Sequence, residues 1–176
     1  MNRADQALGV AVRVVVIGGF GYWWGKQERA EAADPEPGCV AVEAQRELEL
    51  DDEQLAHAAT ITEVGLALDM PARAVVIALA TAMQESGLRN LDYGDRDSLG
   101  LFQQRPSQGW GSEAEVQDPD YAATAFYKTL RKVDGWPEMR VTDAAQRVQR
   151  SAFPEAYQKW AGDAEVLATA LLSCSG

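Results

Sequence analysis

The alternation of apolar and polar positions predicts that most of this chain is helical. Asp51 and Gln54 have the spacing of a capping box, and the apolar pattern that follows predicts a helix to about Leu68. The next helix is expected to begin at Pro71, because proline is favoured in a first helical turn, and to stop at Gly87. These two helices form the first half of the predicted core.

Three further helices are expected toward the C-terminus. The first opens at Asp118-Pro-Asp and ends near Asp134-Gly. Thr142 is expected to cap the next helix, which stops at Pro154, and Pro154 begins a last helix that reaches Leu172. The predicted fold class is therefore all-α, with a single domain of about five helices.

Two segments depart from the helical pattern. Residues 39–50 contain alternating apolar positions, such as Val40 and Val42, which predict a short extended or hairpin element. Residues 88–117 lack helical periodicity, so they are expected to form an irregular lobe. Because loops on a rigid scaffold carry most binding groups, the function is expected to lie in this lobe.

The N-terminal segment has a different character. Residues 7–24 are apolar apart from Arg13, and Tyr22, Trp23 and Trp24 suit a membrane interface, so this segment is predicted to be a short membrane span. The alternative is a secretory signal that is cleaved near Ala30-Glu-Ala. In either case the following domain is expected outside the cytoplasm, as a single-pass cell-membrane protein or as a secreted one.

The predicted organisation has three parts. Residues 1–25 are the anchor or signal, residues 26–38 are a polar linker with two prolines and a glycine, and residues 39–176 are the domain. A chain of 176 residues with 47% hydrophobic content can bury one core. No cofactor is expected.

Charge narrows the choice of partners. The chain has 16 basic and 27 acidic residues, a net charge of −11, and no basic stripe with interleaved aromatic residues. Such a chain repels a phosphate backbone, so nucleic acid is not an expected partner. The membrane, through residues 7–24, and a cell-wall polymer remain as partners, and protein partners are left open.

The two cysteines lie at opposite ends of the predicted domain. Cys39 follows the linker and Cys174 lies two residues from the end, which predicts a disulfide in an oxidising compartment. Closing so long a loop would stabilise the fold by roughly 3–5 kcal/mol in the chain-entropy model. The alternative is two unrelated cysteines. Neither has a Cys or His neighbour at metal-ligand spacing, so no zinc site is expected.

Glu85 is the candidate catalytic residue. It lies in the last turn of an apolar helix, where the helix dipole and neighbours such as Met83 and Leu88 are expected to raise its pKa. A carboxyl that keeps its proton near neutral pH can act as a general acid toward a glycosidic bond. The alternative is a solvated surface charge. The adjoining lobe contains aromatic and amide side chains of the kind that bind sugars, namely Tyr93, Phe102, Gln103, Gln104, Gln108 and Trp110.

For two of these aromatic residues a structural role competes with a binding role. Phe102 is flanked by Leu99 and Leu101, which favours a place in the core beneath the lobe. For Trp110, between two glycines, the core and the binding surface are equally expected.

The motif around Glu85 resembles a known family. Glu85-Ser-Gly, followed by Ser98-Leu-Gly-Leu-Phe-Gln and Pro106, is similar to the Glu-Ser … Ser-x-Gly-Leu-x-Gln-x-x-Pro pattern of soluble lytic transglycosylases, in the lysozyme-like superfamily. The covered region is roughly residues 71–172. The resemblance implies a lysozyme-like fold and cleavage of peptidoglycan between N-acetylmuramic acid and N-acetylglucosamine. It also implies that Glu85 acts first as acid and then as base, leaving a 1,6-anhydro end.

The same resemblance assigns binding positions. Ser98 and Gln103 map onto pocket positions that orient the substrate, and Ser86 follows the acid as in the family. Gln104 and Trp110 are further candidate substrate-binding residues, from the composition of the lobe. Residues 78–157 also resemble an actinobacterial group of membrane-anchored or secreted proteins of unestablished role.

One part of the family pattern is missing. The Ala-Tyr-Asn-Ala-Gly segment that lines the cleft of these enzymes is replaced by residues 145–157, Ala-Gln-Arg-Val-Gln-Arg-Ser-Ala-Phe-Pro-Glu-Ala-Tyr. This run resembles a Val-Gln-x-Ser-Ala-x-Pro-x-x-Tyr segment of phage tail-associated lysozyme-like domains. Gln149, Ser151 and Tyr157 are therefore expected to serve the cleft. The replacement leaves two rival functions open, an inverting muramidase and a non-catalytic module that binds glycan or protein.

Other polar groups have competing interpretations. Residues 90–97 resemble the start of a calcium loop, but Leu101 stands where a glutamate ligand belongs, so an acidic turn is favoured and no metal is expected. Within that turn, Asp95 or Asp97 could supply the second carboxylate that an inverting muramidase needs. His57 is expected to be structural. Arg147, Arg150 and Lys159 form a basic patch that could contact wall or peptide carboxylates, although a solubilising surface is favoured.

Overall fold

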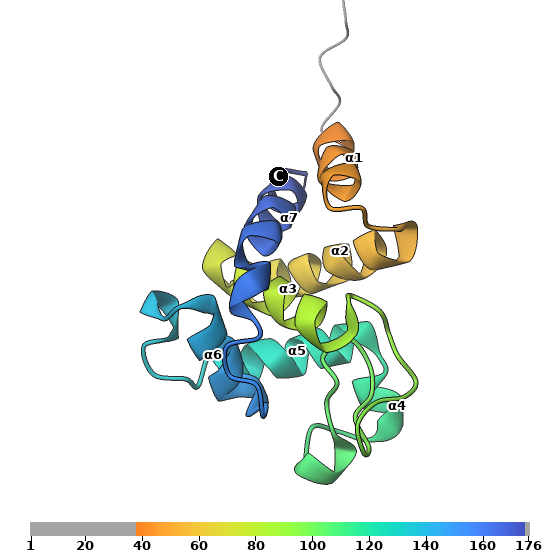
Figure 1. Ribbon diagram of the computed structural model, residues 1–176, viewed down its shortest axis with the longest axis vertical. Coiled ribbons are helices and arrows are strands. Elements are labelled where there is room, and N and C mark those ends of the chain that lie inside the picture. The colour runs from red at the N-terminus through yellow and green to blue at the C-terminus, as the bar shows by residue number, and fades with distance from the viewer. Residues whose placement is uncertain (1–37, 175–176) are drawn as a thin grey trace, which may run out of the picture. The chain divides into compact units, whose positions relative to one another are not determined.

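The computed structural model describes residues 38–174, which form seven α-helices, three short 3-10 helices and no β-strand (Figure 1). The all-α prediction is confirmed for this part of the chain. The α-helices are α1 (Gly38–Glu47), α2 (Asp52–Ala67), α3 (Ala72–Ser86), α4 (Glu113–Val116), α5 (Pro119–Leu130), α6 (Val141–Gln149) and α7 (Ala161–Ser173). The 3-10 helices are η1 (Pro106–Gln108), η2 (Trp136–Glu138) and η3 (Gln158–Trp160).

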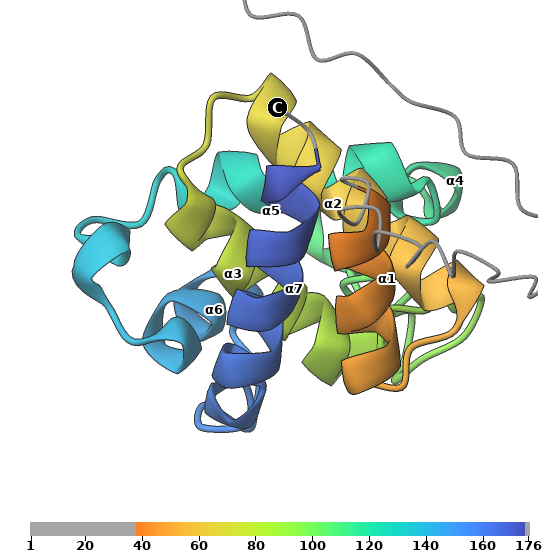
Figure 2. The same cartoon turned by 90° about the horizontal axis from the view of Figure 1, so that it is seen from above.

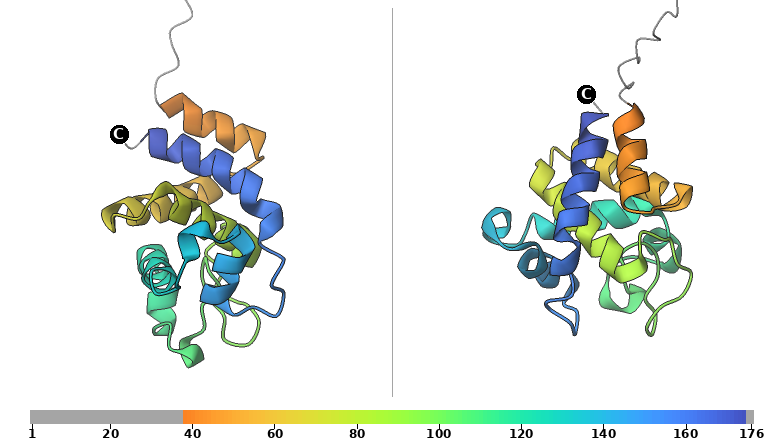
Figure 3. Two further views of the ribbon diagram at one scale, coloured as in Figure 1. Left: turned by 90° about the vertical axis from the view of Figure 1, so that its left-hand side faces the viewer. Right: turned by 45° about the horizontal axis from the view of Figure 1, so that its top comes forward.

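Helix α3 is the centre of the domain. Every residue from Ala74 to Met83 is buried, so this helix is enclosed on all sides. It contacts α2, α5, α6 and α7. Figure 3 shows α1 and α7 side by side over one face of α3, with α5 and α6 on the opposite face. Glu85, in the last turn, therefore emerges from the middle of the core.

The first element is a helix, so the prediction of an extended or hairpin element over residues 39–50 is wrong. Ala41, Ala44 and Leu48 contact the core, and their spacing of three and four residues is helical. Alternation of larger residues such as Val42, which is exposed, suggested a strand instead. Small alanines carried the helical signal too weakly to be recognised. Helix α1 packs against α7.

The capping box predicted for α2 is confirmed. The Asp51 carboxylate accepts from the backbone N–H of Gln54, and the Gln54 side chain accepts from the backbone N–H of Asp51. Gln54 also donates to the carbonyl of Gly87 at 2.8 Å, and His57 donates through Nδ1 to the carbonyl of Leu88 at 2.8 Å. His57 is structural, as expected, and both side chains hold the end of α3.

Later boundaries differ in part from the prediction. Asp118 caps α5 as expected, but the helix ends at Leu130, before Asp134. Thr142 is not a cap: it lies buried in the first turn of α6, and its hydroxyl donates to the carbonyl of Pro154. The last helix begins at Ala161 and not at Pro154.

The predicted membrane segment and most of the linker lie outside the described residues. Within residues 38–174 no helix has the length and apolar character needed to cross a membrane. The side chain of Cys39 is also outside the described part, so the disulfide with Cys174 stays a prediction. The backbone runs so that the start of α1 lies beside the end of α7, which Cys174 caps (Figures 2 and 3).

The close crossing of α2 and α5 gives a test of the packing. A Cβ atom on Gly65 would lie 2.9 Å from the hydroxyl oxygen of Tyr127 and 3.2 Å from a methyl carbon of Val75. Overpacking of this kind costs about 1–3 kcal/mol, more than the roughly 1 kcal/mol that alanine gains over glycine within a helix. We expect Gly65→Ala to lower the melting temperature, and Gly162→Ala, where nothing lies within 4 Å, to leave it unchanged or raise it.

A double-mutant cycle measured by thermal denaturation isolates the clash. Tyr127→Phe removes the nearest atom, along with a hydrogen bond to the carbonyl of Ile61. In that background Gly65→Ala should cost less than in the parent chain. Equal costs in both backgrounds would show that the contact does not limit the packing.

Candidate functional site

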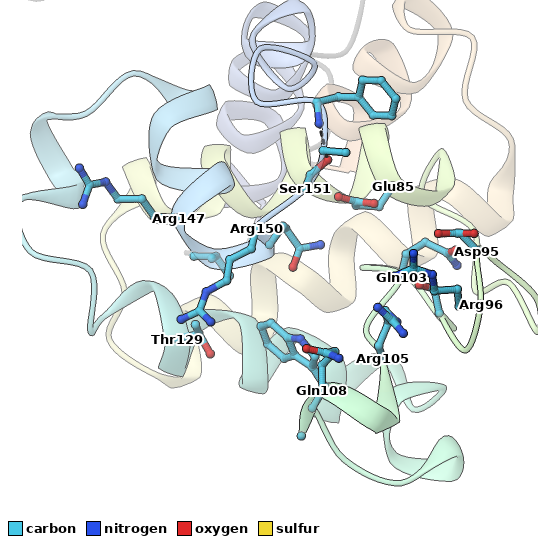
Figure 4. Close-up of a pocket in the computed structure, with 17 residues that line it drawn as sticks. Glu85, Asp95, Arg96, Gln103, Arg105, Gln108, Thr129, Arg147, Arg150 and Ser151 are labelled. Carbon is cyan, nitrogen blue, oxygen red and sulfur yellow. Dashed lines mark hydrogen bonds between the residues drawn. The ribbon is translucent and has the colours of Figure 1, made fainter.

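A cleft of about 720 Å³ opens beside the end of α3 (Figure 4). One wall is the irregular lobe between α3 and α4, and the other is the end of α6 with the segment that follows it. Glu85 lies between the two walls. The catalytic and sugar-binding candidates from the sequence that line the cleft are Glu85, Ser98, Gln103, Gln108, Trp110, Gln149 and Ser151.

Glu85 is half-buried and held by one strong hydrogen bond. The hydroxyl of Tyr157 donates to Oε1 of Glu85 at 2.6 Å. Burial raises the pKa of the Glu85 carboxyl above its ordinary value of 4.5, while hydrogen bonds from Tyr157 and Gln149 partly oppose that rise. The direction agrees with the prediction. The largest cause of the raised pKa is the burial of the carboxyl, which removes water from it.

Tyr157 is fully buried and anchors the carboxyl. Burial raises the pKa of its phenol, and the negative charge of Glu85 raises it further, so the phenol stays protonated and acts as a donor. Because Oε1 accepts this bond, a proton on Glu85 is held on the other oxygen. Gln149 is fixed in turn, since its amide donates to the carbonyl of Phe102 at 2.6 Å.

The Ser98 to Gln103 motif forms the floor of the lobe. Leu99 and Gln104 exchange two backbone hydrogen bonds of 3.0 Å each, which closes a tight loop. Gly100, at φ +74°, is required there because a Cβ would lie 2.1 Å from the carbonyl oxygen of Val116. Ser98, which is buried, and Gln103, at φ +46°, are thereby brought to the cleft.

Three candidates for substrate binding do not line the cleft, namely Tyr157, which is fully buried, Ser86 and Gln104. The Ser86 hydroxyl donates to the carbonyl of Leu101 at 2.7 Å, which ties the end of α3 to the lobe. Gln104 is buried and donates to the carbonyl of Ala122 at 3.0 Å, which ties the lobe to α5. Ser86 and Gln104 are placed to support the site and not to contact a ligand in it.

The aromatic residues of the lobe divide in the same way. Phe102 is buried and stacks on Phe126 with ring centroids 4.8 Å apart, so its expected core position is confirmed. Trp110 lines the cleft and also packs against the core. Tyr93 is 68% exposed and lies away from the cleft. Phe153, 73% exposed, lines the cleft and was missed by the sequence analysis.

The two candidate second carboxylates differ. Asp97 accepts from Arg105 Nε at 2.7 Å and from the backbone N–H of Ser107 at 2.8 Å. Hydrogen bonds from Ser107 and Arg105 hold the pKa of Asp97 far below its usual value, and this residue does not line the cleft. Asp95 is exposed and does line it. Within residues 38–174 no group of three His, Cys, Asp or Glu side chains could hold a metal ion.

The predicted basic patch is split by the fold. Arg147 and Arg150 line the cleft, whereas Lys159 lies over the ring of Trp160, 4.9 Å from its centroid. Two more arginines that the sequence analysis did not select, Arg96 and Arg105, line the opposite wall (Figure 4). Nothing in their local sequence distinguishes them from surface arginines. Only the folded chain brings them to one cavity.

A comparison with models of known protein families gives no match for this chain, and a comparison with curated proteins gives no match either. The arguments for function therefore rest on the motif and on the geometry of the cleft.

The hydrogen bond from Tyr157 can be tested by titration. We expect Tyr157→Phe to raise the pKa of Glu85 further, because the bond that favours the ionised carboxylate is lost while its burial remains. Carbon-13 NMR of labelled glutamate, with Glu85→Gln to assign the signal, measures the shift. An unchanged or lower pKa would show that the phenol does not stabilise the carboxylate.

Burial of Glu85 also predicts a dependence of stability on pH. The raised pKa means that the unfolded chain releases this proton at a lower pH than the folded chain, so stability falls as pH rises from about 4.5 through the folded pKa. Glu85→Gln should therefore raise the melting temperature at about pH 7 but leave it unchanged at about pH 3. Glu63→Gln, an exposed position in α2, is the control. Equal effects of the two substitutions would contradict the prediction.

Proposed function

We propose that this protein is a lysozyme-like, peptidoglycan-cleaving enzyme of the lytic transglycosylase type. It would cut between N-acetylmuramic acid and N-acetylglucosamine, with Glu85 as its single acid and base. The observation that carries the proposal is the desolvated Glu85 carboxyl, hydrogen-bonded to Tyr157 at 2.6 Å and lining an open cleft. The resemblance of the surrounding motif to that family supplies the substrate and the reaction.

The proposed chemistry follows from the state of this carboxyl. A protonated Glu85 donates its proton to the glycosidic oxygen, and the bond to the muramic acid C1 breaks with oxocarbenium character. The resulting carboxylate then takes the proton from the C6 hydroxyl of the same sugar, which closes onto C1. One carboxyl serves both steps, and Tyr157 holds it in position throughout.

Groups on the two walls are suited to hold the sugars. Ser98 and Gln103 from the lobe and Gln149 from α6 offer hydroxyl and amide groups to sugar hydroxyls. The rings of Trp110 and Phe153 provide aromatic surface for a pyranose face. Ser151, in the segment that follows α6, offers a further hydroxyl on the α6 wall.

Asp95 keeps an inverting muramidase as a second candidate function. Such an enzyme uses a second carboxylate to activate water, and Asp95 is the exposed carboxyl that lines the cleft with Glu85. Asp97 suits this role poorly, because it is engaged by Arg105 and Ser107. A non-catalytic glycan- or protein-binding module on the same fold would use the walls of the cleft without depending on Glu85.

We further propose that the domain acts outside the cytoplasm. The apolar residues 7–24 would anchor it in the cell membrane or direct its secretion, which brings the cleft to the cell wall. The Cys39–Cys174 disulfide would fit the same compartment.

Product analysis tests the proposed reaction. The full-length chain is incubated with purified peptidoglycan, and the soluble products are identified by mass spectrometry. We expect 1,6-anhydromuramic ends from the parent chain and from Asp95→Asn and Asp97→Asn. Glu85→Gln should lower their yield by about 10²–10⁴-fold, the usual contribution of a general acid.

The other outcomes separate the rival functions. Reducing ends that disappear in both Glu85→Gln and Asp95→Asn would establish a hydrolase with two carboxylates. An absence of products, together with binding to insoluble wall that Glu85→Gln leaves unchanged, would leave only a binding module.

A further inference from the structure

The cleft is positively charged in a chain that is strongly acidic. Four arginines line it, against the carboxyls of Glu85 and Asp95. The whole chain has 27 acidic and 16 basic residues, so this cavity reverses the overall balance. Figure 4 shows Arg96 and Arg105 on the lobe wall and Arg147 and Arg150 on the α6 wall, with Glu85 between them. Arg150 on one side and Arg96 and Arg105 on the other therefore line the ligand space, whereas the guanidinium of Arg147 points away from Glu85.

Two of these arginines lack a partner within the described residues. Arg105 is paired with Asp97 at 2.7 Å, and the charge of Arg147 acts on Asp143. In contrast, the side chains of Arg96 and Arg150 make no hydrogen bond or ion pair to any residue in the range 38–174. Among arginines outside the cleft, Arg89 is paired with Asp51 and Glu53 and Arg140 with Asp143 and Glu155, whereas no such pair is made by the exposed Arg46 within the described residues.

The backbone positions of the two unpaired arginines are also unusual. Arg96 has φ +58° and Arg150, which ends α6, has φ +55°. A residue other than glycine in this left-handed region costs of order 1 kcal/mol and persists where its surroundings enforce it, often at ligand sites. Gln103, also in the cleft, is a third such position. The same conformation occurs outside the cleft at Glu49, Asp69 and Leu88, so it accompanies these side chains without being confined to them.

We propose that the cleft binds glycan through anionic carboxylate substituents, with Arg96 and Arg150 as specificity-determining residues on the two walls. The inference rests on the proposed function and adds to it a preference among glycans. A planar guanidinium binds a carboxylate through two parallel hydrogen bonds, which gives direction as well as attraction. A neutral polymer of N-acetylglucosamine offers these groups only hydrogen bonds to uncharged oxygens, which are weaker than bonds to a carboxylate.

Carboxylates in peptidoglycan have two sources, which binding experiments can separate. The first probe is a tetrasaccharide of alternating N-acetylglucosamine and N-acetylmuramic acid with free lactyl carboxylates. The second is the same tetrasaccharide with those carboxyls converted to amides. The third carries stem peptides, so its lactyl groups are amide-linked and its carboxylates belong to the peptide.

Isothermal titration calorimetry is carried out on the full-length chain carrying Glu85→Gln, which prevents cleavage. An exposed ion pair strengthens binding by up to about fivefold, so two pairs should favour a carboxylate probe over the amide probe by about tenfold. This preference should weaken at high salt. Adding Arg96→Gln and Arg150→Gln should abolish it. Adding Arg46→Gln, an exposed arginine in α1, removes the same kind of charge outside the cleft and should preserve it.

Each outcome bears on the inference. A preference for the first probe places the recognised carboxylates on the sugar, and one confined to the third places them on the peptide; both support the inference. Equal binding of charged and amide probes, or a preference that survives the loss of Arg96 and Arg150, overturns it while leaving the proposed function intact. No binding of any probe, with no products from the wall, overturns both.

Discussion

The enclosure of α3 by its neighbouring helices is the constraint on which the rest of the structure depends. A helix that is apolar on all sides is stable only when it is covered on all sides, and α2, α5, α6 and α7 provide that cover. The same burial removes water from the last turn, where Glu85 lies. Hydrophobic packing and the weakened acidity of one carboxyl therefore have a single origin, because the core that stabilises the domain also raises the pKa of Glu85.

The end of this helix is fixed by polar groups from three directions. Gln54 and His57 of α2 donate to the carbonyls of Gly87 and Leu88, and Ser86 donates into the lobe. Carbonyls at a helix C-terminus have no partner within the helix, so these bonds satisfy groups that would otherwise need water. The end of α3 is therefore a rigid support for a cleft whose walls are irregular segments. A catalytic carboxyl benefits from such a support, because small displacements strongly reduce the rate of proton transfer.

What the sequence could predict was set by how local each signal is. The capping box of α2 depends on residues three positions apart, and the start of α5 on the run Asp118-Pro-Asp, and both were predicted correctly. The helix α1 was missed because its buried face is formed mainly by small alanines. The place of Glu85 in the last turn of its helix followed from the apolar pattern that stops at Gly87. Arg147 and Arg150 were recognised as a basic patch, but Arg96 and Arg105 were not, since the two pairs meet only through the tertiary fold.

The hydroxyl of Tyr157 donates to Oε1 of Glu85, so proton exchange is left to the other carboxyl oxygen. A carboxyl held in this way can release and take up a proton at only one of its two oxygens. In a reaction with two proton transfers, both must use that one oxygen, one after the other. The oxygen that receives the first proton has to withdraw before the oxygen that gives up the second can approach. The hydrogen bond from a buried phenol would then impose the order of the two proton transfers. The second transfer could begin only after the leaving sugar has moved away from Glu85.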